Sequence, residues 1–150
     1  MLPDGVRSSR LLHPLRILLC DDSPVERLAL GHFLRQNGFD VDEVGDGQSA
    51  IESLRYRMID LILLDLHMPG IDGFAVLKYL HQHRPGLPVL VLSGMPVDDI
   101  QQEIHGLPNH ELPPLLLKPV DPEQLLDLIA MRFRGFEDSS NDSVEDSPAA

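Results

Sequence analysis

Five short, largely apolar runs alternate with helical patterns along the chain, and this alternation constrains the fold most. The runs cover residues 16–20, 40–44, 60–64, 88–92 and 114–117. Runs this short suit strands that are buried on both faces, as in a parallel sheet covered by helices. Right-handed crossovers then place helices on both sides of one sheet. We therefore expect an α/β fold, a (βα)5 doubly wound sandwich with a five-stranded parallel sheet.

Capping and turn residues predict where the helices begin and end. Ser23-Pro24-Val25-Glu26 is typical of a capping box with proline at the first helical position, and Asn37-Gly38 is typical of a helix end. The expected buried face of this first helix comprises Val25, Leu28, Ala29 and Phe33.

Later helices are indicated by similar signals. Asp46 and Asp72 are expected N-caps of helices that carry Ile51/Leu54 and Phe74/Leu77/Leu80. A last helix is expected from Asp121 to about Phe133, and a weaker helical pattern covers residues 97–104.

Length and charge bound the domain organisation and the partners. A chain of 150 residues suits one domain, and we expect a flexible tail over 1–14, a domain over 15–136 and a disordered acidic tail over 137–150. Lys+Arg 12 against Asp+Glu 24 argues against direct nucleic-acid binding. The apolar runs are too short to cross a membrane, and the single Cys20 suits a reducing, cytoplasmic location.

Polar residues follow four of the five runs directly. Asp21-Asp22 follow the first run, Asp65 the third, Ser93 the fourth and Lys118 the fifth. Ligands of an open parallel sheet bind outside the carboxyl ends of the strands, and in the order 2-1-3-4-5 the binding point lies between the first and third strands. Each residue also has an ordinary role as a cap, a turn residue or a surface charge. Their coincidence at one rim favours a functional site.

Three clustered carboxylates need a cation. They repel by about 4 kcal/mol per pair at 4 Å with an effective dielectric constant of 20. Carboxylate and carbonyl oxygens suit Mg²⁺, or Mn²⁺, better than zinc. Together with the ammonium group of Lys118, such an ion would supply the positive charge that a phosphoryl group on a carboxylate requires.

These residues resemble a known family. The pair Asp21-Asp22, the stretch Asp65-Leu66-His67-Met68-Pro69-Gly70-Ile71-Asp72-Gly73, Ser93-Gly94 and Lys118-Pro119 together resemble the receiver domain of two-component response regulators, over about residues 15–134. The resemblance implies a flavodoxin-like fold and a phosphoacceptor that takes its phosphoryl group from a sensor histidine kinase or a histidine phosphotransfer protein. Its output would pass to a downstream protein effector.

The resemblance also implies a role for each site residue. Asp65 would be the phosphoacceptor, and Asp22, Asp65 and the backbone carbonyl of His67 would bind Mg²⁺ directly. Asp21 would hold the ion through water. Lys118 would pair with the phosphoryl oxygens, Ser93 would turn its hydroxyl group towards them, and the Lys118-Pro119 bond would be cis. His67 is either a tuner of the phosphoryl lifetime or an ordinary loop side chain.

Two features depart from the family pattern. Leu115 stands where the family usually has Tyr or Phe, and Leu offers neither the phenolic hydroxyl group nor the aromatic edge that couples Ser93 to the last strand. The segment 95–114 is long and rich in proline. No helix-turn-helix pattern follows Phe136, so we expect a stand-alone domain that acts through protein contacts.

Three other functions compete with the receiver interpretation. An aspartate-nucleophile phosphatase would need a carboxyl group at position 67, which is His. A flavin-binding protein would need a phosphate loop where the two acids Asp21 and Asp22 stand. A receiver-like interaction module that is not switched by phosphorylation is the main alternative, and Leu115 is the best argument for it.

Overall fold

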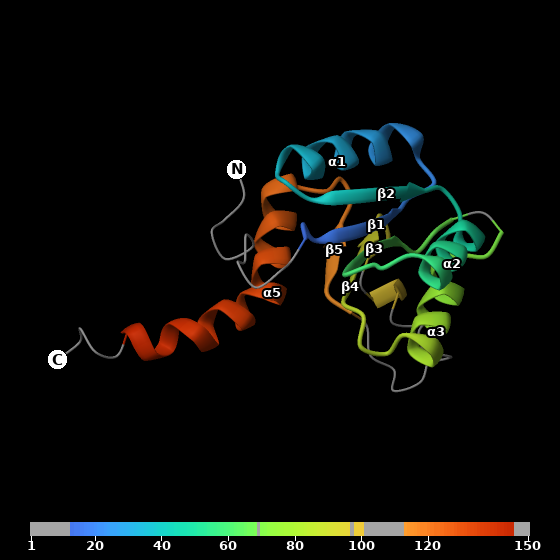
Figure 1. Cartoon of the computed structure of the whole chain (residues 1–150). Coiled ribbons are helices and arrows are strands. Elements are labelled where there is room, and N and C mark those ends of the chain that lie inside the picture. Colours follow the sequence, from blue (N-terminus) through green and yellow to red (C-terminus); the bar gives the residue numbers. More distant parts are fainter. Residues whose placement is uncertain (1–12, 69, 97, 101–112, 146–150) are drawn as a thin grey trace.

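Five parallel strands form one sheet in the order β2-β1-β3-β4-β5 (Figure 1). The structure is a computed structural model that describes residues 13–145 except 69, 97 and 101–112, with side chains described up to Phe133. The strands are β1 (Arg16–Cys20), β2 (Asp40–Val44), β3 (Leu61–Asp65), β4 (Val89–Ser93) and β5 (Leu115–Leu117). This confirms the predicted fold class and strand order.

Three strands begin one residue later than the sequence predicts. Proline has no N–H group to donate to a neighbouring strand, so Pro88 and Pro114 precede β4 and β5 and serve only as acceptors. The N–H of Ile62 donates to the carbonyl of Pro88 at 3.1 Å, and that of Val91 donates to Pro114 at 2.8 Å. Strands β3 and β4 also extend one residue further than predicted, so Asp65 and Ser93 are the last residues of their strands.

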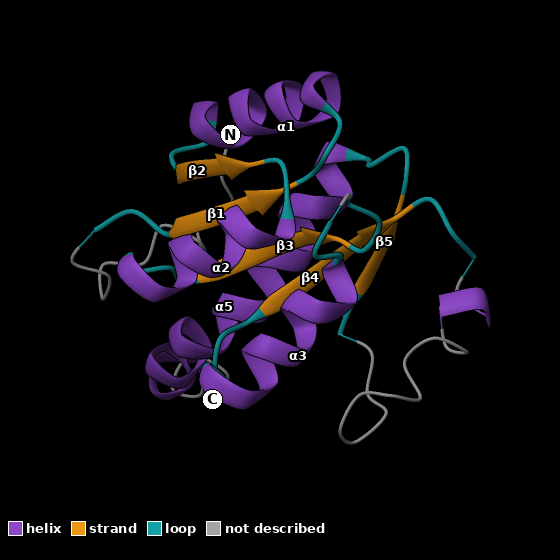
Figure 2. Ribbon diagram, turned by 90° about the vertical axis from the view of Figure 1, so that its right-hand side faces the viewer, coloured by secondary structure: helices purple, strands orange, loops and turns teal. Residues whose placement is uncertain are grey.

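Successive side chains of the central strands enter opposite cores. Ile17 and Leu19 of β1 lie in one apolar cluster, whereas Leu18 and Cys20 lie in the other. Helices α1 (Pro24–Gln36) and α5 (Pro122–Glu145) cover the first cluster, and α2 (Gly47–Tyr56) and α3 (Gly73–His83) cover the second (Figures 1 and 2). Burial on both faces explains why these strands are apolar throughout.

The buried face of α1 agrees with the prediction only at Phe33, which is half-buried against the core. Val25 and Leu28 are 78% and 62% exposed, and the helix buries Leu30, Gly31 and Leu34. Counted from Arg27, these residues recur at the spacing i, i+3, i+4, i+7 of one helix face. The sequence analysis did not predict this buried face, because the face begins with a charged residue and includes a glycine.

Most helix ends agree with the sequence. Asp46 accepts the N–H of Ser49 at 2.7 Å, Asp72 accepts that of Ala75 at 3.0 Å, and Asn37 is the C-cap of α1. None of the helices in the described ranges combines the length and the apolar run needed to cross a membrane.

Two segments differ in extent from the predicted helices. Helix α5 continues to Glu145, past Phe136 where a disordered tail is expected to begin. A helix, once started, gains one hydrogen bond for each residue added, so it can continue without an apolar face. Of the predicted helical pattern over 97–104, residues 98–100 are helical, and the others lie outside the described residues, as do 1–12 and 146–150.

Candidate functional site

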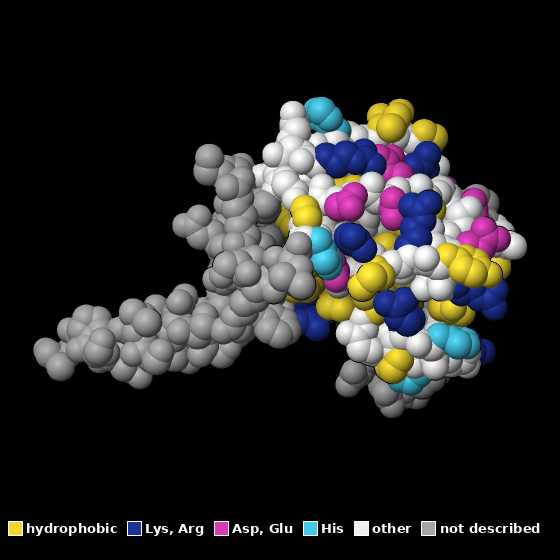
Figure 3. All heavy atoms as spheres, viewed as in Figure 1, with side chains coloured by type: hydrophobic (Ala, Val, Ile, Leu, Met, Phe, Trp, Pro, Cys, Tyr) yellow, Lys and Arg dark blue, Asp and Glu magenta, His cyan; other side chains and the backbone are white. Residues whose placement is uncertain are grey.

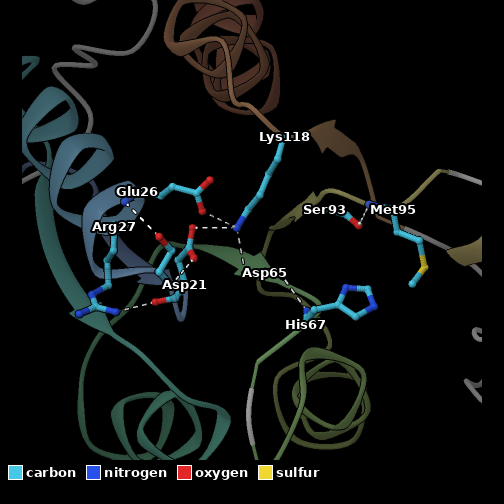
Figure 4. Close-up of polar contacts among 9 residues, drawn as sticks. Asp21, Glu26, Arg27, Asp65, His67, Ser93, Met95 and Lys118 are labelled. Carbon is cyan, nitrogen blue, oxygen red and sulfur yellow. Dashed lines mark hydrogen bonds and ion pairs between the residues drawn. The ribbon is translucent and has the colours of Figure 1, made fainter.

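The polar residues that follow the strands lie along one edge of the sheet, as their positions predict. Asp21 and Asp22 follow β1, Asp65 ends β3, Ser93 ends β4 and Lys118 follows β5. Figure 4 shows the Lys118 side chain extending towards Asp21 and Asp65, with Ser93 off to one side. The structure therefore assembles three acids and one lysine from three strands.

Asp21 is buried and fixed by several contacts. Its side chain is 3% exposed, its Oδ1 accepts the N–H of Ser23 at 2.9 Å, and its Oδ2 lies 3.1 Å from the ammonium nitrogen of Lys118. Its main-chain carbonyl accepts a hydrogen bond from the guanidinium of Arg27 at 2.6 Å. Both the side chain and the main chain of Asp21 are thus held in place.

Asp65 is equally buried and uses both carboxylate oxygens. Oδ1 accepts the N–H of His67 at 3.0 Å, and Oδ2 accepts a hydrogen bond from Lys118 at 3.0 Å. Burial raises the pKa of the Asp65 carboxyl above its ordinary value, because the charged form loses its water. The N–H of His67 and the charge of Lys118 oppose this rise in pKa, and the nearby charge of Asp21 adds to it.

Lys118 forms ion pairs with three carboxylates. Its ammonium nitrogen lies 3.0 Å from Asp65, 3.1 Å from Asp21 and 3.1 Å from Glu26, and its side chain is 16% exposed. Burial by itself lowers the pKa of Lys118, but the hydrogen bonds to the acids outweigh burial and raise this pKa above its ordinary value. Lys118 therefore carries its positive charge throughout the physiological pH range.

The contact between Glu26 and Lys118 was missed by the sequence analysis. In a capping box the Glu26 carboxylate would reach back to the N–H of Ser23. Here Asp21 accepts that N–H, and only the other half of the box forms, with the N–H of Glu26 3.4 Å from Oγ of Ser23. The available signal was the position of Glu26 in the first turn of α1, four residues after Asp22.

Arg27 is a second residue that the sequence analysis missed. Besides its bond to Asp21, it lies 3.6 Å from Glu43 of β2, which also contacts Arg35 at 2.6 Å. A Cβ atom at Gly31 would lie 2.5 Å from the Glu43 carboxylate, so the end of the Glu43 side chain would have to shift to accommodate one. Figure 3 shows basic and acidic side chains side by side on this face of the molecule. The ion pairs connect β2 and α1 to the main chain of the site.

The three acids form a group that suits a hard metal ion. Asp21, Asp22 and Asp65 each offer a carboxylate oxygen, and these oxygens lie within 4.8 Å of one another. Asp22 is exposed, and none of the described residues forms a hydrogen bond or ion pair with its carboxylate. Oxygen ligands of this kind are those that Mg²⁺ and Mn²⁺ prefer. The donor set therefore fits the expected Mg²⁺, and Asp22 is the acid left open to it.

Ser93 is buried near this group but does not join it. Its Oγ accepts the N–H of Met95 at 2.9 Å, and its carbonyl accepts the main-chain N–H of Lys118 at 2.7 Å. The Lys118-Pro119 peptide bond is cis, as the resemblance implied. Leu115 is half-buried and packs against the core that α2 and α3 cover.

The loop after β3 is held by close packing at two glycines. A Cβ atom at Gly73 would lie 2.4 Å from Cα of Leu66 and 2.5 Å from the carbonyl of Asp65, and one at Gly47 would lie 2.0 Å from the carbonyl of Ile71. The exposed ring of His67 meets Phe74 edge to face at 6.3 Å. Helices α2 and α3 thereby fix the main chain that carries Asp65.

Comparisons with known proteins agree on one family. The family model of the response regulator receiver domain matches residues 17–130. The receiver protein structure from Pseudomonas putida superposes with a TM-score of 0.69 at 29% identity, covering 79% of this chain and 98% of that one. This agreement confirms the resemblance seen in the motifs.

Two curated relatives are mycobacterial regulators. The probable transcriptional regulatory protein TcrX of Mycobacterium tuberculosis is 37% identical over 94 residues, which are 63% of this chain and 39% of that protein. The DNA-binding response regulator MtrA of Mycolicibacterium smegmatis is 34% identical over 123 residues, which are 82% of this chain and 52% of that protein. The chain thus spans about half or less of their lengths. Because MtrA is named as DNA-binding, the expectation of no nucleic-acid contact is not supported.

Proposed function

The chain belongs to the response regulator receiver domain family, and from this premise we propose that it accepts a phosphoryl group on Asp65. The donor is a phosphohistidine of a sensor histidine kinase or of a histidine phosphotransfer protein. One observation supports this above all. A single ammonium group, from Lys118, contacts both the buried Asp65 and the buried Asp21, so the acceptor carboxylate lies beside a fixed positive charge.

The proposed transfer is an in-line displacement. A carboxylate oxygen of Asp65 forms a bond to phosphorus while the bond from phosphorus to the imidazole nitrogen breaks, and the electron pair leaves with that nitrogen. Lys118 pairs with the phosphoryl oxygens, and its charge offsets the negative charge that the group brings. Hydrolysis of the resulting acyl phosphate returns Asp65 to a carboxylate.

Mg²⁺ is the proposed cofactor, with Mn²⁺ as a substitute. When bound, the ion neutralises charge on the phosphoryl oxygens. Asp22, Asp65 and the main-chain carbonyl of His67 would hold it directly, and Asp21 through water. The openness of the Asp22 carboxylate and the spacing of the three acids support this assignment.

Ser93 and His67 have proposed roles around the phosphoryl group. The hydroxyl group of Ser93 would leave the N–H of Met95 and turn towards the phosphoryl oxygens. His67, which is exposed beside Asp65, would influence how fast water attacks the acyl phosphate. Leu115 cannot offer the aromatic edge or hydroxyl group usual at its position, so we propose an output that differs from the usual switch.

The wider assignments rest on the same proposal. The domain covers residues 15–136, with tails over 1–14 and 137–150, and its output passes to a downstream protein effector. A cytoplasmic location suits a single cysteine that is buried and unpaired. A receiver-like interaction module that is not switched by phosphorylation is not favoured, because the acids and Lys118 are in contact.

Phosphorylation in vitro tests the proposal. The protein is incubated with acetyl phosphate or phosphoramidate and Mg²⁺, and its intact mass is measured. The expected result is a gain of one phosphoryl group, absent from the Asp65→Asn variant and abolished by removing the metal with a chelator. A folded wild-type protein that gains no mass would contradict the proposal.

A further inference from the structure

We propose that Glu26 is an internal counter-ion that a phosphoryl group must displace from Lys118, and that its charge therefore sets how readily the site accepts anionic phosphodonors. This inference rests on the proposed function and adds to it a residue of α1. The contact that carries it is the ion pair between Oε2 of Glu26 and the ammonium nitrogen of Lys118, at 3.1 Å (Figure 4).

The hydrogen-bonding capacity of Lys118 is fully used. An ammonium group has three N–H donors and no acceptor. In this structure it contacts three carboxylates, those of Asp21, Glu26 and Asp65, at 3.0 to 3.1 Å. An incoming phosphoryl oxygen can bind Lys118 only if one carboxylate leaves.

Glu26 is the carboxylate that leaves most easily. Its side chain is 49% exposed, whereas those of Asp21 and Asp65 are 3% and 5% exposed. Asp21 is also held by the N–H of Ser23, and Asp65 by that of His67. Among the described residues, the Glu26 carboxylate contacts Lys118 alone. On release it passes into water, so it avoids the cost of leaving a buried charge unpaired.

The local structure explains why Glu26 is available for this role. Ser23 caps α1, and its N–H is taken by Asp21 instead of by Glu26. Glu26 therefore has no capping bond to keep its carboxylate at the helix end. Pro24 begins α1 directly after Ser23, which fixes the first turn and the position of Glu26 beside Lys118.

A negative charge at this position also repels the donor. Acetyl phosphate is a dianion near neutral pH, whereas phosphoramidate carries one net negative charge. Removing the charge of Glu26 should therefore speed phosphorylation by the first donor more than by the second. One exposed unit charge about 4 Å away in water changes the rate on the order of fivefold for each unit of donor charge. The expected gain is therefore on the order of fivefold with phosphoramidate and larger with acetyl phosphate.

The experiment measures the rate of phosphorylation by intact mass at saturating Mg²⁺ and low ionic strength. The variants are Glu26→Gln and Glu26→Ala. The first removes the charge but keeps a side-chain oxygen that can accept a hydrogen bond from Lys118, and the second removes both. The matched control is Glu52→Gln, the same change at an exposed position of α2. Both Glu26 variants should be phosphorylated faster than the wild type by acetyl phosphate, and the increase in rate should be smaller with phosphoramidate. The control should react at the wild-type rate with both donors.

Ionic strength separates this charge effect from a structural one. Added salt should bring the rates of the Glu26 variants and of the wild type together, because screening weakens the repulsion. Rates for Glu26→Gln that equal those of the wild type, or an equal gain with both donors, would overturn the inference while the wild type still gained a phosphoryl group. A wild type without any mass gain would overturn the proposed function, and the inference with it.

Discussion

The ammonium nitrogen of Lys118 lies 3.0 Å from Oδ2 of Asp65, although 53 residues separate them in the chain. The same nitrogen lies 3.1 Å from Oδ2 of Asp21, 97 residues away. One lysine thus balances acids from the ends of two neighbouring strands, β1 and β3. Without it, the carboxylates would repel one another at a buried edge of the sheet.

Replacing Lys118 should therefore cost stability as well as function. In Lys118→Ala, two buried carboxylates lose their charged partner, and the free energy of unfolding in metal-free buffer should fall by about 1–3 kcal/mol. Added Mg²⁺ should recover part of this loss, since a ligand of the native state stabilises it. The phosphorylation-dependent response should weaken.

Urea denaturation, followed by circular dichroism with and without Mg²⁺, measures this effect. The matched control is Lys78→Ala, which removes the chain's other lysine from an exposed position of α3. An equal change in the free energy of unfolding for both variants would count against the role assigned to Lys118.

The raised pKa of Asp65 predicts a pH dependence. Because burial raises the pKa in the native state, the folded protein binds more protons than the unfolded chain at pH values between the unfolded and the folded pKa. The contribution of Asp65 to stability is fully present below the unfolded pKa and is lost as the pH rises through the folded pKa. Asp65→Asn removes this titration, so in a chelating buffer the free energy of unfolding of the wild type should fall relative to that of the variant as the pH rises from acid to neutral.

Urea denaturation at a series of pH values from acid to neutral checks the sign. With Mg²⁺ present the wild type should instead have the higher free energy of unfolding at neutral pH, because it binds the ion more tightly than the variant does. A difference between the two proteins that stays constant with pH would show that burial does not disfavour the charged carboxylate.

Cys20 should be unreactive in the folded protein. Burial, together with the negative charges of Asp21, Asp65 and Asp46, raises the pKa of its thiol, and the thiolate is the reactive form. At mildly alkaline pH, labelling by iodoacetamide should be at least about a hundredfold slower for the native protein than in concentrated urea. Mass spectrometry of the labelled protein measures both rates, and equal rates would mean that the β1 core opens readily.

The sequence predicts the sheet well because each strand signal is local. Five apolar runs, each close to a polar residue at its carboxyl end, are visible without any knowledge of contacts, and parallel strands bring such ends to one edge. Asp21, Asp65 and Lys118 could therefore be placed together from their positions alone. The observed strands begin one residue later than predicted only at β3, β4 and β5, where Asp60, Pro88 and Pro114 come directly before the first paired residue.

The helix contacts were harder to predict because they depend on how α1 is rotated. The predicted apolar face comprises Val25, Leu28, Ala29 and Phe33. Of these only Phe33 packs against the core, half-buried, and the helix instead buries Leu30 and Leu34. Where a helix carries two apolar faces, tertiary contacts determine which of them is buried. The same rotation brings Arg27 to Asp21 and Glu26 to Lys118. The position of Glu26 in the first turn of α1 is visible in the sequence, but it does not identify a partner 92 residues away.

Gly73 offers a final test of how the site is held. Its missing side chain lets α3 approach the main chain of β3, and its N–H donates to the carbonyl of Leu66 at 3.0 Å. A methyl group there would meet the main chain of Asp65 and Leu66, which cannot move without moving the acceptor carboxylate. Gly73→Ala should therefore lower the free energy of unfolding by about 1–3 kcal/mol, as overpacking does.

The same substitution should also slow phosphorylation, because Asp65 is displaced relative to Lys118. Gly86→Ala is the matched control, since a Cβ atom at Gly86 meets nothing within 4 Å. It should change the free energy of unfolding by no more than about 0.5 kcal/mol. Denaturation curves and intact-mass rates for the two variants decide the matter. If Gly73→Ala matched Gly86→Ala in both measurements, the packing of α3 against β3 would not be what positions Asp65.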